Sequence, residues 1–347
     1  MADITASERN TQTASAASAP RRRQSYMQSL LPLNRLPNRI RYRIAKNILR
    51  KSLLTVKVFD FNMVVPIQVP GIGKGLSVYG HRELDQYYIL HNVLRSGDTV
   101  LDIGANIGYY AGIEGKIIGP TGFIHAVEPD PRNVAILRQN LELNRPAPKS
   151  QVHAAAISNQ SGSIFFQIAE RANLNSVVRS KADDDEKQVS RGMGNRKYIE
   201  QIEVPSLDLS DFLESATPSV NLIRMDVEGH EVQILGSLAK KLREDPGFDK
   251  APDCILFEPH SWEYAEDDHL EPVLRSLLSN GYAITYLGSR SEPDSPMRKL
   301  GLTPIHTATE ARGVTRGVYK DIPQDVAIEL AARTDGVTTV CLQRTQV

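Results

Sequence analysis

Residues that could do chemistry gather in two short stretches of this 347-residue chain. The first runs from Asp102 to Tyr110, reads Asp-Ile-Gly-Ala-Asn-Ile-Gly-Tyr-Tyr, and is followed by an acidic residue, Glu128. The second runs from Asp226 to Glu231 and reads Asp-Val-Glu-Gly-His-Glu. Each stretch follows a short apolar run, so we expect each to lie at the tip of a buried strand. Glycine turns of this kind hold cofactors, and clustered carboxylate and imidazole groups move protons.

The first stretch has the features of a nucleoside-binding turn. The apolar run from Val100 to Ile103 predicts a parallel strand, Gly104 to Gly108 predict a glycine turn, and a helix follows. Such a turn brings backbone N–H groups and a helix N-terminus towards a ligand. Glu128 ends the next predicted strand, 123–127, where a carboxylate can accept both hydroxyls of a ribose. We therefore expect a nucleoside-containing cofactor here, the alternative being a turn that merely connects strand to helix.

The identity of the cofactor depends on single positions in the turn. A dinucleotide fingerprint requires a second glycine where Asn106 stands, and the Gly73-Lys74 pair lacks the glycine and the Ser or Thr of a P-loop. The pattern D-x-G-A-N-x-G-x-Y, with Glu128 after it, resembles the S-adenosylmethionine (SAM) site of class I methyltransferases. Its asparagine form resembles one branch of them, the FkbM family. The D-x-E-G-x-E pattern at Asp226 to Glu231 is similar to the second signature of that family.

The resemblance covers roughly residues 79–287 and implies a fold and a reaction. The implied fold is an α/β, Rossmann-like, doubly wound sheet of seven strands, mostly parallel with an antiparallel closing strand, and with helices on both faces. The implied activity is SAM-dependent O-methylation of a hydroxyl on a sugar, a glycolipid or a polyketide-type small molecule. The residues themselves do not select one acceptor among these classes.

The resemblance also assigns residues to the cofactor. Backbone of the glycine turn would face SAM, Asn106 would meet its polar tail, and Glu128 would hold the ribose. Glu83 precedes a helix that starts near it, so it would either line the pocket or be a solvated first-turn residue favoured by the helix dipole. The expected cofactor-binding residues are Glu83, Asp102, Gly104, Ala105, Asn106, Gly108, Glu128 and Asp226.

Catalytic candidates follow the fourth and fifth predicted strands. The first and fourth strands of a doubly wound sheet flank the point where strand order reverses, so the Asp226 stretch should face the glycine turn. We expect Asp226 beside the reacting methyl group and His230 or His260 as general base, because an imidazole titrates near neutral pH. Either histidine could instead be a surface or supporting group. The expected substrate residues are Asn175, Ser176, Glu228 and Glu258.

A metal ion is an open alternative at the same strand ends. We assign no metal ligand, yet the acidic residues at 226, 228, 231 and 258 could bind a divalent cation, as in some O-methyltransferases. Two of these carboxylates could instead cap the following helix.

The N-terminal part of the chain differs in composition from the remainder. Residues 21–59 carry eleven Lys or Arg and no Asp or Glu, although the whole chain has zero net charge. We expect a disordered tail over 1–34, a basic amphipathic helix and short strands over 35–78, and a methyltransferase domain over 79–347 with a polar insertion at 179–198. The favoured interpretation packs the helix's isoleucines, Ile40, Ile44 and Ile48, onto the domain; contact of residues 35–51 with an anionic membrane surface or a nucleic-acid backbone is the alternative.

Composition places limits on location and on other functions. Two cysteines lie in apolar runs, which indicates buried thiols, and the sequence has no run of eighteen apolar residues. We therefore expect a cytoplasmic protein. It would lie peripherally at a membrane if residues 35–51 bind one. A nicotinamide-dependent oxidoreductase is disfavoured by Asn106 and by the Asp226 stretch. A non-catalytic SAM-binding or nucleic-acid-binding module has the basic segment as its only support. We do not expect a nucleic-acid substrate, because the fourth strand ends without an N/D-P-P-Y/F motif.

Overall fold

The computed structural model describes residues 36–144, 147–171, 174–178, 198–311 and 313–345. The predicted N-terminal tail, 1–34, lies outside the described residues, and so does the predicted polar insertion up to residue 197.

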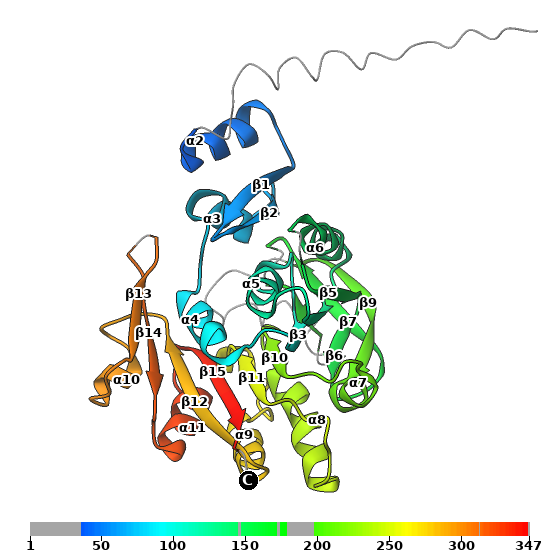
Figure 1. The fold of residues 1–347 in the computed structure, drawn as a ribbon, viewed down its shortest axis with the longest axis vertical. Helices are drawn as coiled ribbons and strands as arrows, with labels where there is room; N and C mark the ends of the chain where they lie inside the picture. The colour runs from blue at the N-terminus through cyan, green and yellow to red at the C-terminus, as the bar shows by residue number, and fades with distance from the viewer. Residues whose placement is uncertain (1–35, 145–146, 172–173, 179–197, 312, 346–347) are drawn as a thin grey trace, which may run out of the picture.

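One large mixed sheet organises the described part of the chain (Figure 1). Its strands run in the order β13-β14-β12-β15-β11-β10-β3-β4-β5, and the block from β11 to β5 is parallel throughout. Strand β15 is antiparallel to both β11 and β12, which confirms the predicted closing strand. The strand bounds are β3 Thr99–Ile103, β4 Phe123–Val127, β5 Lys149–His153, β10 Leu222–Met225, β11 Cys254–Phe257, β12 Tyr282–Ser289, β13 His306–Thr309, β14 Thr315–Lys320 and β15 Val337–Arg344.

The predicted count of seven strands is wrong, because this sheet has nine among the described residues. The two additional strands, β13 and β14, form a hairpin that pairs with β12 and extends that edge of the sheet. Their sequence has little alternation of apolar and polar residues, and β14 is stabilised by pairing with distant segments, so local periodicity does not reveal it.

Helices cover both faces of the sheet, as predicted, and successive strand residues show why. Val100 packs in one apolar cluster with Ile113 of α5, whereas its neighbour Leu101 packs in another with Leu235 of α8. Strands buried on both sides are typical of doubly wound α/β proteins. The first face carries α4 Leu84–Val93, α5 Tyr109–Ile118 and α6 Pro131–Leu143, and the second carries α7 Leu209–Ser215, α8 Glu231–Glu244, α9 Leu270–Ser279 and α11 Gln324–Arg333.

A second, smaller sheet follows β5 in the chain and has the strand order β6-β9-β7-β8 (Figure 1). Its long hairpin pairs β7 with β9 in antiparallel register, while β6 is parallel to β9. The bounds are β6 Ala156–Ser158, β7 Gly162–Ala169, β8 Ser176–Val177 and β9 Tyr198–Asp208. Two short helical turns, η5 Ser261–Glu263 and α10 Pro296–Lys299, complete the body.

The N-terminal segment packs against the first face through a hairpin, β1 Leu53–Val58 with β2 Phe61–Pro66, followed by α3 Ile72–Tyr79. Phe61 is buried in the same cluster as α5, where its ring occupies the space that a Cβ on Gly112 would need. A side chain at that position would push the hairpin away from the helix. Residues 53–79 therefore share a core with the large sheet.

The basic helix forms, but its isoleucines do not all pack as we favoured. It comprises α2 Asn38–Arg43 and a π-helical turn, η2 Ile44–Ile48. Tyr42 and Ala45 are the buried residues, whereas Ile40 is 47% exposed and Ile48 is 70% exposed. The packing face is thus offset from the isoleucine stripe, and the wider π-turn changes the side-chain spacing after Arg43. No helix among the described residues is long and apolar enough to cross a membrane.

Candidate functional site

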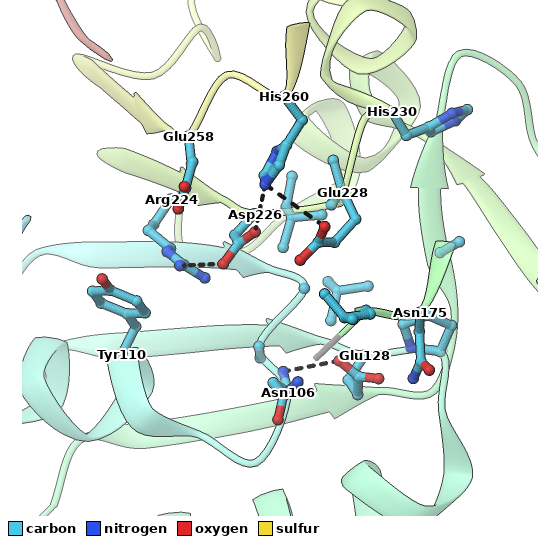
Figure 2. Close-up of a pocket in the computed structure, with 18 of the residues that line it drawn as sticks. Asn106, Tyr110, Glu128, Asn175, Arg224, Asp226, Glu228, His230, Glu258 and His260 are labelled. Atoms are coloured by element: carbon cyan, nitrogen blue, oxygen red, sulfur yellow. Dashed lines mark hydrogen bonds and ion pairs between the residues drawn. The ribbon is translucent and has the colours of Figure 1, made fainter. Parts of the chain in front are cut away.

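A cavity of about 310 Å³ lies at the carboxyl ends of β3, β4, β10 and β11. Its volume falls in the range of about 300–1,000 Å³ that is usual for small-molecule sites. The turn after β3 and Glu128 line one side of the cavity, and residues that follow β10 and β11 line the other (Figure 2). The two stretches singled out in the sequence therefore face one another across a single cavity.

The turn that links β3 to α5 is held by its own hydrogen bonds. The backbone N–H groups of Gly104 and Ala105 both donate to the carbonyl of Val127, at 2.9 and 3.0 Å, and that of Asn106 donates to Glu128. The expectation of free N–H groups aimed at a ligand is therefore wrong for these residues. Because these three N–H groups already donate to Val127 and Glu128, the turn offers a ligand a fixed backbone surface and not these hydrogen-bond donors.

Gly104 allows the tips of two strands to converge. Its φ is +76°, and a Cβ there would lie 2.1 Å from the carbonyl oxygen of Asp226. No side chain fits in that space, so glycine at 104 brings the end of β10 against the turn. Gly108 has a similar φ of +87°, but it lies beside Leu137 and does not line the cavity. We therefore do not retain Gly108 as a cofactor contact.

Glu128 is buried and its carboxylate is fixed in place. It accepts hydrogen bonds from the backbone N–H of Asn106 at 2.8 Å and of Asp130 at 2.9 Å, and from the side-chain amide of Asn133 at 3.3 Å. A carboxylate has about four acceptor positions, so room remains for a ligand hydroxyl. Burial raises the pKa of Glu128 to about 7.

Glu83 lines the cavity and is 5% exposed, so its interpretation as a solvated first-turn residue is wrong. Tyr110 donates its hydroxyl to Glu83 at 2.6 Å, and Arg82 forms an ion pair with it. Burial raises the pKa of Glu83, but Arg82 and Arg316 outweigh burial and lower it to about 2. A permanent negative charge beside two arginines therefore lies at this end of the cavity.

Asp102 is fully buried and does not line the cavity, which corrects its assignment as a cofactor contact. Its carboxylate lies 3.4 Å from the guanidinium of Arg224, which also contacts Asp226 at 3.1 Å and lies over the ring of Tyr110. Burial raises the pKa of Asp102 to about 6. Arg224 thus ties the tip of β10 to β3, and Asp102 acts on the cavity only through that arginine.

His260 stands at the centre of the other side, among carboxylates (Figure 2). Its Nδ1 lies 2.8 Å from Glu231, and its Nε2 lies 3.9 Å from Asp226 and 3.8 Å from Glu228. Burial lowers the pKa of His260, but the acidic neighbours, Glu231 first among them, raise it well above the ordinary imidazole value. Burial also raises the pKa of nearby Glu258 to about 8, and Glu258 lies 3.7 Å from Arg290.

The two histidine candidates have different surroundings. His230 lines the cavity, but its Nε2 lies 2.8 Å from the hydroxyl of Ser158, and Figure 2 shows its ring turned away from Asp226. Of the two predicted bases, His260 is therefore the one placed beside Asp226.

The predicted substrate residues Asn175 and Ser176 lie just before and at the start of β8, and their side chains have different surroundings. Asn175 lines the cavity and donates its amide to Asp130 at 2.9 Å. Ser176 does not line it, and its hydroxyl lies 3.0 Å from that of Tyr198. Asn175 and Val177 both line the cavity and Ser176 between them does not, the alternation expected of extended backbone.

Sequence reasoning missed several residues that line the cavity. Tyr110 lies within the motif and Trp262, the only tryptophan, lies two residues after His260, so either could have been found by position. Arg290 and Arg316 come from a region, 288–335, that shows no readable pattern. The missed residues include Ile72, Arg82, Tyr109, Tyr110, Phe166, Leu174, Arg224, Trp262, Glu263, Arg290 and Arg316.

The residues present fit SAM. A fixed carboxylate at the tip of the second strand suits a ribose, the pairing of Glu83 with arginines suits a zwitterionic amino-acid group, and Asp226 lies opposite. Together with the strand order, the site defines a SAM-dependent methyltransferase.

The sequence profile of the methyltransferase FkbM domain matches residues 102–284, more than half of the chain. A relative from Streptomyces tacrolimicus, 31-O-demethyl-FK506 methyltransferase FkbM, is 30% identical over 190 residues, which cover 49% of this chain and 72% of the relative. The chain belongs to the FkbM methyltransferase family, and SAM is its cofactor. Methyltransferase 1 of Beauveria bassiana is 27% identical over 145 residues, covering 40% of this chain and 57% of that protein.

Solved structures that match the chain do so with low TM-scores and low identities. TYW2 of M. jannaschii, in complex with AdoMet, is 13% identical, covers 85% of this chain and 88% of its own, and has a TM-score of 0.35. An rRNA methylase from Streptococcus thermophilus is 7% identical, covers 75% and 95%, and has a TM-score of 0.34.

Proposed function

We propose that this protein is an O-methyltransferase that transfers the methyl group of SAM to a hydroxyl of a sugar, a glycolipid or a polyketide-type small molecule. One observation carries the proposal: Asp226, Glu228 and His260 form a polar cluster that faces the β3 turn across the cavity. An acceptor hydroxyl needs such acceptors and bases within reach. The relative named 31-O-demethyl-FK506 methyltransferase supports an oxygen acceptor.

The cofactor side of the cavity would bind and orient SAM. Glu128 would accept a ribose hydroxyl, the backbone of Gly104, Ala105 and Asn106 would support the nucleoside, and Glu83 would meet the charged amino-acid end. When bound, SAM supplies a methyl group activated by its sulfonium charge. Methyl transfer is an in-line displacement, so positioning provides much of the rate.

The acceptor side would hold the hydroxyl against that methyl group. Asp226 is placed for this task, because Arg224 holds one carboxylate oxygen and the other faces His260. As the acceptor oxygen bonds to the methyl carbon, the carbon–sulfur bond breaks and the hydroxyl proton passes to the cluster of Asp226, Glu228 and His260. Asn175 and Glu258 line the same space and would contact the remainder of the acceptor.

The test is a methyl-transfer assay with labelled SAM and a panel of saccharide, glycolipid and macrolide hydroxyl acceptors. We expect label in at least one oxygen-linked methyl group, and loss of that product in Asp226→Asn. Label found only on nitrogen or carbon of the products would contradict O-methylation.

We also propose that the exposed isoleucines of the basic helix contact an anionic membrane surface. Ile40 and Ile48 are exposed on a segment, 38–51, that contains Arg and Lys but no acidic residue. Apolar and basic side chains on one short helix suit such a surface. The full-length protein should float with anionic liposomes, and the double variant Ile40→Asp, Ile48→Asp should not; equal behaviour of the two proteins would end this proposal.

A further inference from the structure

We propose that Asp226, Glu228 and His260 form a binding site for a divalent cation of the Mn²⁺ type at the acceptor end of the cavity. One ligand atom from each residue lies within 4.8 Å of the other two. The Nε2 of His260 lies 3.9 Å from Asp226 and 3.8 Å from Glu228. Two ligands that are each about 2.1 Å from one ion lie no more than about 4.2 Å apart, so both separations suit a shared ion.

The imidazole distinguishes this cluster from an ordinary group of surface acids. His260 is 4% exposed, and its Nε2 makes no hydrogen bond to any residue that the structure describes, since the two carboxylate contacts are too long for one. His260 lines the cavity, and a cation between the three groups would give its Nε2 a ligand contact and offset the two negative charges beside it.

The other ring nitrogen is held as metal ligands usually are. Nδ1 lies 2.8 Å from a carboxylate oxygen of Glu231, a residue that is fully buried at the start of α8. Histidine ligands generally donate their second N–H to a carboxylate, which fixes the tautomer and aims the lone pair at the metal. When Nδ1–H is bonded to Glu231 and a cation displaces the proton from Nε2, the lone pair of Nε2 is directed towards the space beside Asp226 and Glu228.

An arginine side chain holds one carboxylate at this point, and an uncommon backbone conformation carries the other. Arg224 occupies one oxygen of Asp226 and leaves the other towards His260. Glu228 has a φ of +51°, a left-handed conformation that is uncommon outside glycine. Such strain is maintained at functional sites because it directs a side chain. Two carboxylates and one imidazole suit Mn²⁺, and the open coordination positions would take water or an acceptor oxygen.

The chemical role of the cation rests on the proposed function, whereas cation binding itself does not. A coordinated acceptor hydroxyl would release its proton to water more easily, because the cation stabilises the alkoxide. The alkoxide oxygen then bonds to the methyl carbon as the carbon–sulfur bond breaks. With the cation bound, Asp226, Glu228 and His260 would act as ligands in this step, and the proton would pass to water in place of the transfer to this cluster that is proposed above for the cation-free site.

The test is a titration of the purified full-length protein with Mn²⁺, followed by the electron paramagnetic resonance signal of free Mn²⁺. We expect the wild-type protein to bind Mn²⁺ and the variants Glu228→Gln and His260→Gln to lose at least tenfold in affinity. Glu266→Gln is the matched control, since Glu266 is exposed on the loop that follows η5. A thermal shift with SAM in every variant shows that the fold and the cofactor site remain.

The outcomes separate the two proposals. Mn²⁺ binding that depends on Glu228 and His260 supports the site, even if no hydroxyl acceptor is ever methylated. Absence of Mn²⁺ binding, or equal binding by the wild-type protein and both variants, overturns the site. O-methylation that persists in EDTA together with absent Mn²⁺ binding would leave the proposed function standing and remove the cation from it.

Discussion

The two sides of the cavity are built in different ways. On the cofactor side, the turn after β3 is fixed by backbone hydrogen bonds to β4, and Glu128 is held by two backbone N–H groups. On the acceptor side, position depends on side chains that hold one another: Arg224 holds Asp226, and Glu231 holds His260. The geometry of the cofactor side should therefore persist when a charged side chain on the acceptor side is replaced. The geometry of the acceptor side should change when any one of its charged side chains is removed.

Asp226→Asn should give the largest functional change. The variant loses a charged acceptor beside the reacting methyl group, and we expect methyl transfer to fall by about 10²–10⁴-fold, the range for loss of acid–base assistance. SAM binding should change little, because Glu128 and the turn are untouched. Asp267→Asn, an exposed residue on the loop after η5, is the control. Equal activity of the two variants would show that Asp226 does not take part in the reaction.

Glu128→Gln tests the cofactor side alone. A charged hydrogen bond is worth about 1.5–3 kcal/mol, so SAM affinity should fall by about 10–100-fold by calorimetry. Binding of Mn²⁺ should be unchanged, because Glu128 belongs to the other side of the cavity. Parallel losses of both ligands would mean that the two sides are not independent.

The pH dependence of SAM binding should follow the same carboxylate. Because the pKa of Glu128 is raised to about 7, its ionised form, which accepts a ribose hydroxyl, is populated above pH 7 and lost below it. We expect the SAM dissociation constant to rise as pH falls from 8 to 6, and the dependence to disappear in Glu128→Gln. A flat profile in the wild-type protein would assign the ribose contact to another group.

Replacement of Glu114 should have the smallest effect, a change in the stability of the folded protein. It is fully buried in α5, its carboxylate oxygens make no hydrogen bond to any residue in the described ranges, and burial raises its pKa well above the ordinary value. The unfolded chain ionises this carboxyl near pH 4.5 while the folded protein retains the proton, so the group costs stability increasingly as pH rises above that value.

Glu114→Gln removes the titration and should raise the melting temperature by a few degrees at pH 8. Well below pH 4.5 the gain should shrink to little or nothing, because both states then carry a neutral carboxyl. Differential scanning calorimetry at the two pH values measures this difference, and a larger gain at low pH would reverse the assigned sign.

Elements set by local sequence could be predicted closely. Strands β4 and β11 begin and end where their apolar runs do, and Asp130 caps α6 by accepting a hydrogen bond from the backbone N–H of Arg132 at 2.9 Å. Such features depend on a few neighbouring residues. The hairpin of β13 and β14 depends on pairing with β12, so the strand count could not be predicted.

The same division applies to the site. The motifs brought Gly104, Glu128 and Asp226 to one cavity, because parallel strands end at the same edge of the sheet. They could not show that Asp102 is covered by Arg224, or that His230 turns to Ser158 while His260 turns to Asp226. Those orientations depend on side-chain packing between distant segments.

The central claim, that the cavity is a SAM site, is tested most directly by thermal melting of the purified protein with SAM, S-adenosylhomocysteine or NAD. A ligand at a hundred times its dissociation constant stabilises the folded state by about 2.7 kcal/mol, which shifts the melting temperature by several degrees. We predict a shift with SAM and with S-adenosylhomocysteine, none with NAD, and a smaller shift with SAM in Glu128→Gln. A shift with NAD alone, or no shift with SAM at saturating concentration, would contradict the account.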